Sequence, residues 1–320
     1  MIRSVPHIER DDPPTESYRG NLEYLSDELR RLDLLIRLNI RQQPTLPGPF
    51  DQFKGLVISE EEIDILLSDR SPFDRSGLSE AAGPRYGELL DALAKLDKEI
   101  IERRRASLQG GVYLSLPRLV QLFHLTPFDE RCLVVCLAPE LDRKYEKLFG
   151  YLHDDVTRKK PSVDLLLNLL RETAEERLAA RLAFDPAAPM MKYRLLQITD
   201  TSPDGPLPLL SRPLKLDDRI VSFLLGHNQL DGRLEPLARV IPPSNEREYP
   251  GLDDETRQRA AGFVRSHLND PRSAGRNLVF NLSGAYGSGA HLLARAVCND
   301  IGIPLVVADV RKMKIGRAHV

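Results

Sequence analysis

Hydrophobic residues recur with helical spacing in two long stretches of the first third of the chain. After Tyr18 the apolar positions alternate in steps of three and four, which predicts a long amphipathic helix that ends before Pro44; these positions are Leu22, Leu25, Leu29, Leu32 and Ile36. A second stripe runs from Tyr86 to Ile100. We expect the two helices to pack against each other within the chain as a hairpin or small bundle. An oligomerising coiled coil is the weaker alternative, because each stripe lasts only about three heptads.

Shorter elements lie on both sides of Gly110 and Gly111, which mark a domain boundary. Before the two glycines, a capping box of Ser59 and Glu62 predicts a short helix. After them the pattern predicts helices over 116–125, from Thr126 as N-cap, over 140–152 and from 161, then strands over 193–198 and 207–214, and a helix over 217–225. Several short helices followed by a β-hairpin are the element order of a winged-helix domain.

The last part of the chain reads as a linker followed by alternating helix and strand. Residues 227–252 are rich in Pro, Gly, Asn and charge, which is typical of a linker. Beyond them the pattern predicts a helix over 253–267, an apolar strand over 277–282, an Ala- and Leu-rich helix to 299 and a second apolar strand over 304–310. A strand, a helix and a strand joined by short turns predict a parallel β-α-β unit.

The glycine-rich turn after the first of these strands has the position of a Walker A loop. Gly284 and Gly289 stand at its two glycine positions. In such a loop the backbone wraps a phosphate, a lysine binds the outer phosphates and a hydroxyl holds Mg²⁺. We therefore predict a nucleotide-binding site for ATP and Mg²⁺ formed by Gly284, Tyr286, Gly287, Ser288, Gly289, Ala290 and His291.

Two positions depart from the Walker A pattern. Ala290 stands where the lysine belongs, and His291 stands where the hydroxyl belongs. Losing a charge-assisted phosphate contact costs on the order of 2–3 kcal/mol of binding, so we expect binding of ATP and Mg²⁺ to be weakened. Asp309 imitates a Walker B aspartate but follows Gly289 too closely, and we assign it to the end of the second strand. The alternative interpretation is a plain strand-to-helix turn.

Composition narrows the remaining chemistry. The net charge of -2 gives no general attraction to nucleic acid, and no run approaches the ~18 apolar residues that span a bilayer. Three cysteines are too few for a disulfide framework, so we expect a reducing, cytoplasmic location. Cys132 and Cys136 lie one helical turn apart without a second pair, and we expect them to be small buried residues. His124 and His153 fall in amphipathic helices. We predict no catalytic or metal-binding residue.

Charge also bears on DNA binding by the predicted winged helix. Residues 111–226 contain 16 Lys and Arg and 16 Asp and Glu, which gives no electrostatic footprint for phosphates. Arg158 to Lys160 form one basic cluster beside Asp154 and Asp155, ahead of an apolar helix that suits packing better than a DNA groove. We therefore expect a protein-interaction or positioning role. A DNA-binding regulator is the alternative.

The stretch 133–170 resembles a known family, above all over Cys136 to Asp155 and Pro161 to Leu165. It is similar to the winged-helix region of AAA+ ATPases that are found with phage-tail-like contractile injection systems. The resemblance extends from about residue 15 onward. It implies an N-terminal helical region, a variant winged helix and a C-terminal AAA+ domain that acts as an ATP-driven, homo-oligomeric ring. The family's P-loop glycines match Gly284, Gly287 and Gly289, whereas Ala290 departs at the lysine position.

The predicted fold is mainly α, with an α+β winged helix and the start of an α/β P-loop domain of the AAA+ type. The segments are a disordered arm 1–15, a helical region 16–110, a winged helix 111–226, a linker 227–252, a truncated AAA+ domain 253–314 and a tail 315–320. The tail matches the translation of a widely used sequencing adapter, and we expect it to be an artefact. We predict a protein-binding part of an AAA+ ATP-binding protein, without hydrolysis by the chain as given. The alternative is a non-catalytic adaptor.

Overall fold

The computed structural model describes residues 16–42, 83–199, 205–244, 249–270, 278–283 and 289–309. The chain divides into two compact units, Met1–His227 and Asn228–Val320. None of the described helices is long and apolar enough to cross a membrane. The predicted arm 1–15, the short helix that follows Ser59 and the tail 315–320 lie outside the described residues.

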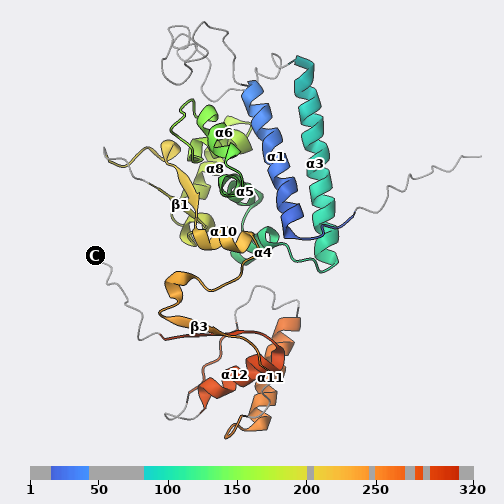
Figure 1. Ribbon diagram of the computed structural model, residues 1–320, viewed down its shortest axis with the longest axis vertical. Coiled ribbons are helices and arrows are strands. Elements are labelled where there is room, and N and C mark those ends of the chain that lie inside the picture. Colours follow the sequence, from blue (N-terminus) through green and yellow to red (C-terminus); the bar gives the residue numbers. More distant parts are fainter. Residues whose placement is uncertain are drawn as a thin grey trace, which may run out of the picture. The chain divides into compact units, whose positions relative to one another are not determined.

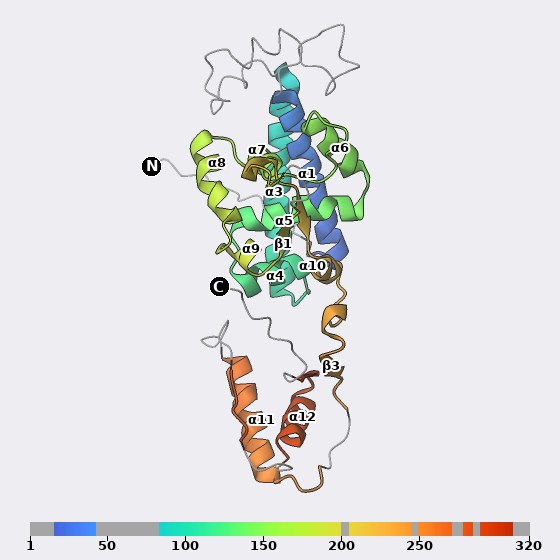
Figure 2. The same cartoon turned by 90° about the vertical axis from the view of Figure 1, so that its left-hand side faces the viewer.

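The two amphipathic stripes form an antiparallel helical hairpin of α1 (Asn21–Gln42) and α3 (Gly83–Gln109), side by side in Figures 1 and 2. Leu25, Leu32 and Ile36 of α1 are buried, as are Leu96 and Ile100 of α3. The prediction of packing within the chain is therefore confirmed. One predicted position of the stripe is not buried, since Leu22 is 72% exposed. The buried side of α1 includes the polar residues Asp27, Glu28 and Asn39.

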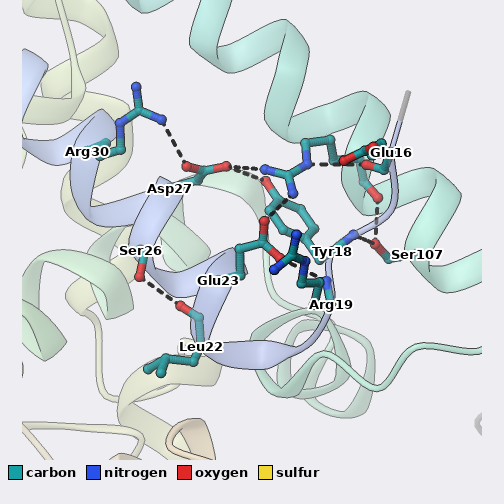
Figure 3. A network of polar contacts seen from close by, with 10 residues as sticks. Glu16, Tyr18, Arg19, Leu22, Glu23, Ser26, Asp27, Arg30 and Ser107 are labelled. Carbon is teal, nitrogen blue, oxygen red and sulfur yellow. Dashed lines mark hydrogen bonds and ion pairs between the residues drawn. The ribbon is translucent and has the colours of Figure 1, made fainter. Parts of the chain in front are cut away.

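Polar contacts set the alignment of the two hairpin helices (Figure 3). Arg103 of α3 donates hydrogen bonds to Asp27 at 2.9 Å and to Glu23 at 2.5 Å, and its guanidinium lies 4.1 Å from the centre of the Tyr18 ring. The backbone N–H of Tyr18 donates to the hydroxyl of Ser107 at 2.7 Å. These contacts join the start of α1 to the end of α3, so the two helices are held in one register.

Helix α5 (Pro127–Leu141) is the centre of the first unit. Thr126 caps it in a capping box with Asp129, and Pro127 is its first residue, as the sequence predicts. Seven consecutive residues of this helix, 132–138, are all buried, including Cys132 and Cys136. Arg104 of α3 reaches this helix in an ion pair, so α5 joins the hairpin to the rest of the unit.

The remaining elements of the first unit follow the predicted winged-helix order. They are α4 (Ser115–Phe123), α5, α6 (Lys144–Leu152), α7 (Val163–Leu170), α8 (Ala174–Ala180), the 3-10 helix η3 (Arg181–Phe184), α9 (Pro189–Lys192), β1 (Leu196–Ile198), η4 (Leu209–Ser211), β2 (Leu214–Leu216) and α10 (Asp218–Leu224). Strands β1 and β2 pair antiparallel, with Leu196 opposite Leu216. An isolated antiparallel β-bridge pairs Ser162, just before α7, with Pro213, just before β2. The core of the unit lies between the sheet, α5, α7 and the hairpin.

Three predicted boundaries in this unit are wrong. The strand expected over 193–198 begins only at Leu196, because α9 continues to Lys192 and residues 193–195 turn out of that helix. The helix expected over 140–152 begins only at Lys144, because α5 continues to Leu141 and the chain turns at Asp142. The strand expected over 207–214 begins at Leu214 instead. Two prolines at 208 and 213 remove backbone donors from that run, which contains η4 in place of a strand.

The second unit contains η5 (Gly232–Leu234), β3 (Ala238–Ile241), α11 (Asp254–Asn269), α12 (Ala290–Ile301) and β4 (Leu305–Ala308). The expected parallel β-α-β unit is wrong for the described residues. The described part of the first expected strand, residues 278–282, is irregular, and β4 pairs antiparallel with β3. β3 lies within the segment expected as a linker. An apolar run forms a strand only where the backbone of another strand pairs with it. Val279, in the described part of the expected strand, is 84% exposed.

Candidate functional site

The predicted nucleotide-binding loop is described only where it enters α12. Four of its predicted residues lie outside the described part of the chain: Gly284, Tyr286, Gly287 and Ser288. Gly289 is the N-cap of α12 and has a φ of 82°, a left-handed conformation that favours glycine. Ala290 and His291 are the first two residues of the helix. The described end of the loop is therefore a glycine turn into a helix, as a P-loop requires.

The start of α12 offers backbone groups and no cation. Among the described residues no side chain caps this helix start, which is the positive end of the helix dipole. The methyl of Ala290 cannot replace a lysine, and the exposed imidazole of His291 is not a hydroxyl ligand for Mg²⁺. The described residues can therefore help to hold an anion, but they lack both side chains that hold the outer phosphates and the metal.

A helix-turn-helix lies in the first unit, between α6 and the β1–β2 hairpin. Helices α7 and α8 are joined by the three residues 171–173. Thr173 caps α8 in a capping box with Glu176. In DNA-binding proteins of this architecture the second helix of the motif reads the major groove. Here α8, continued by η3, occupies that position. This helix is missing from the sequence prediction, although its capping box is a signal that could have found it.

The exposed face of α8 and η3 is acidic and apolar. Its solvent-exposed residues, which we call the α8–η3 face, are Glu175, Glu176, Leu178, Ala179, Arg181 and Leu182. Leu178 is 57% exposed and Leu182 is 73% exposed, one helical turn apart. Two carboxylates at the start of the helix repel DNA phosphates, and a single arginine does not offset them. This face is suited to covering an apolar surface of another protein.

Packing under the α8–η3 face holds it in place. Phe184, at the end of η3, is buried and meets the ring of Phe128 of α5 edge-on at 6.2 Å. The guanidinium of Arg171, in the turn before α8, lies 4.6 Å from the centre of the same Phe128 ring. Both ends of the α8–η3 segment are therefore anchored on α5. In Figure 2, α8 and α9 lie at one edge of the first unit and α6 lies at the other.

The first helix of the motif, α7, is almost entirely buried. Six of its eight residues are buried, namely Val163, Leu165, Leu166, Leu167, Leu169 and Leu170. The expectation that the helix after the basic cluster serves packing is confirmed. Arg158 of that cluster donates to the backbone oxygen of Ser211 at 2.7 Å, which ties it to the segment before β2. It is therefore engaged in the fold of the domain itself.

Buried titratable side chains behave as packing residues. Burial raises the pKa of the Cys132 and Cys136 thiols, and both are completely enclosed, which confirms that they are small buried residues. Burial lowers the pKa of His153, whose ring nitrogen Nε2 lies 3.1 Å from the backbone oxygen of Lys160. His124 ends α4 in a left-handed conformation and is exposed. None of these groups is poised as a nucleophile or base.

The fold and this face define the first unit as a helix-turn-helix domain with a short β-hairpin wing. Comparison with known families gives one match, to the family described as "Winged helix domain, variant", over residues 7–238. The chain belongs to this family. The match includes α1 and α3, so the helical hairpin is part of the family's domain. Neither a curated protein nor a solved structure matches the chain significantly.

Proposed function

We propose that the chain is the N-terminal and winged-helix part of an AAA+ ATP-binding protein, in which the winged helix binds a protein partner. The observation that carries the protein-binding role is the α8–η3 face. Leu178 and Leu182 are uncovered in the position from which related motifs read DNA, and the carboxylates of Glu175 and Glu176 stand beside them. Removing these leucines from water stabilises a protein interface, whereas the carboxylates oppose a phosphate backbone.

The partner and the assembly rest on the family resemblance of residues 133–170. That resemblance supports a component of a phage-tail-like contractile injection system as the partner. It also supports a homo-oligomeric, ATP-driven ring as the working form. The second unit fits the start of a larger domain, because several of its large apolar side chains are exposed; they include Phe263, Val279, Phe280 and Val306. Further protein that packs on these residues would bury them.

The protein-binding role is tested on the α8–η3 face with purified structural proteins of a phage-tail-like contractile injection system. We expect the double variant Leu178→Asp/Leu182→Asp to bind such a partner at least about tenfold more weakly, since buried leucines contribute about 1.5–3 kcal/mol each. Both side chains are exposed, so the far-UV circular dichroism should stay unchanged. A matched control, Leu108→Asp, changes an exposed leucine on α3. Equal loss in variant and control, or none in either, contradicts the proposal.

DNA binding is the competing function and is tested in the same preparation. We expect no shift of a duplex oligonucleotide at low salt, where phosphate contacts are strongest. A salt-dependent shift that Glu175→Lys strengthens and Arg181→Glu abolishes would establish α8 as a DNA-reading helix instead.

A non-catalytic adaptor is the second candidate, and Ala290 favours it. If the chain is such an adaptor, wild type shows no Mg²⁺-dependent binding of a fluorescent ATP analogue, because the lysine and hydroxyl positions hold Ala290 and His291. Ala290→Lys/His291→Thr should gain such binding if the loop is a Walker A loop. Ala294→Lys adds the same charge one turn further along α12 and should gain none. Tight binding by wild type would refute the adaptor.

A further inference from the structure

A second candidate surface lies on the other side of the winged helix, between α6 and the segment 153–160 that follows it. A groove of about 620 Å³ opens there. Its lining residues are Arg143, Lys144, Glu146, Lys147, Gly150, Val156 and Lys159. Four cations face one carboxylate, in a domain whose charges balance only when these residues are counted with the rest. The groove is therefore a local site of positive potential.

Most of this positive charge is unused by the fold. Lys144 binds Asp33 of α1 at 2.8 Å. In the described part of the chain, the side chains of Arg143, Lys147 and Lys159 form no hydrogen bond or ion pair. All three are exposed. Three cations thus remain available to a ligand.

The wall opposite α6 is built tightly. A Cβ on Gly150 would lie 3.4 Å from the backbone oxygen of Asp155 and 3.4 Å from the Cα of Val156, so the segment runs directly against the helix. The N–H of Asp155 donates to the oxygen of Gly150 at 3.0 Å, and its carboxylate accepts from the N–H and hydroxyl of Thr157 at 2.9 and 2.6 Å. Val156 is thereby held 76% exposed in the groove. The site combines exposed cations with one apolar contact.

We propose that this groove binds an acidic segment of a protein partner, whose carboxylates pair with Arg143, Lys147 and Lys159 and whose apolar side chain covers Val156. The inference rests on the proposed protein-binding function and names the chemistry of a partner. Charge complementarity selects the occupant. Single-stranded nucleic acid is the poorer fit, because the lining holds no aromatic ring on which a base could stack.

The test uses the full chain and a short fluorescent peptide of glutamates around one leucine. We expect Lys147→Glu/Lys159→Glu to weaken binding of this peptide by about tenfold, because each reversal replaces an attraction with a repulsion. The matched variant Lys95→Glu/Lys192→Glu has the same net charge but changes lysines outside the groove, and it should change affinity less than about twofold. A peptide with serine in place of leucine should bind wild type more weakly than the leucine peptide does. The two peptides should bind the Val156→Ser variant equally well.

Three results would overturn the proposal. The first is no binding of the peptide by wild type, and the second is equal loss in the groove variant and the matched variant. The third is an oligonucleotide of equal charge that binds more tightly than the peptide and depends on Lys147 and Lys159. Each result leaves the α8–η3 face to its own test, because that face is measured with Leu178→Asp/Leu182→Asp and an injection-system protein. The two proposals can therefore fail separately.

Discussion

The ion pair between Arg104 of α3 and Glu130 of α5 tests how the helical hairpin is attached to the winged helix. Arg104 Nη1 lies 2.8 Å from one carboxylate oxygen of Glu130 and 3.1 Å from the other, and the Glu130 side chain is 12% exposed. Breaking a buried pair costs about 3–5 kcal/mol. Water reaches the 29% exposed Arg104 and offsets part of this cost. We expect Arg104→Met to lower the free energy of unfolding by about 2–3 kcal/mol and Tm by about 5–10 °C.

The neighbourhood of Glu130 is the reason why this loss is large. Glu28 of α1 is almost fully buried close to it, and the Tyr24 hydroxyl donates to Glu130 at 3.4 Å. Removing the guanidinium of Arg104 therefore leaves two buried carboxyls with one cation fewer. The uncompensated charge, rather than the lost hydrogen bonds alone, produces the destabilisation.

A double-mutant cycle separates this explanation from a simple loss of packing. Glu130→Gln removes the charge that Arg104 compensates, so Arg104→Met/Glu130→Gln should be more stable than the sum of the two single changes by at least about 1 kcal/mol. Lys98→Met is the control, since Lys98 and Glu102 form an exposed pair at 3.8 Å and its loss should cost under about 0.5 kcal/mol. Urea unfolding followed by far-UV circular dichroism measures the four proteins of the cycle and the control. Additive effects in the cycle would refute the reasoning.

Three further predictions concern single residues. Thr126→Ala removes the cap of α5 and should cost about 1 kcal/mol in urea unfolding. Burial raises the pKa of the Glu28 carboxyl above 4.5, so the folded state holds this proton more tightly than the unfolded state does. The free energy of unfolding should therefore fall as pH rises from 4.5 through the raised pKa. Glu28→Gln should abolish that fall. Of the three thiols, Cys298 should react first with a thiol reagent in the native protein, whereas the enclosed Cys132 and Cys136 should react only on unfolding. Equal reaction rates of the three would contradict the buried packing of α5.

Periodicity and capping chemistry predicted much of the first unit because they act locally. The stripes of α1 and α3 have helical spacing, and Thr126 with Pro127 marks the start of α5. The order of short helices followed by a hairpin predicted the winged helix that the family match supports. In each case the signal lies within the element that it predicts.

Features that depend on distant residues could not be predicted in the same way. Arg104 and Glu130 are 26 positions apart, and Arg103 and Asp27 are 76 positions apart, so no local pattern reveals either pair. The pairing of β3 with β4 also depends on tertiary contact, because both parallel and antiparallel partners suit an apolar run. The groove of Lys147 and Lys159 forms only when the segment 153–160 folds back on α6. The sequence shows these charged residues, but it does not show that their side chains line one groove.

The position of the hairpin explains why α8 and α6, and not α7, form the outward surface of this winged helix. Helix α1 packs against both α5 and α7, and the side-chain amide of Asn39 donates to the backbone oxygen of Asn168 at 3.2 Å. Helix α7 is thereby enclosed between the hairpin and the core, and it cannot approach a nucleic acid. The family match covers hairpin and winged helix together, so this enclosure belongs to the domain. A helix-turn-helix with its first helix buried and its second helix acidic retains the architecture of a DNA reader, and the face that its second helix exposes carries Glu175, Glu176 and Leu178.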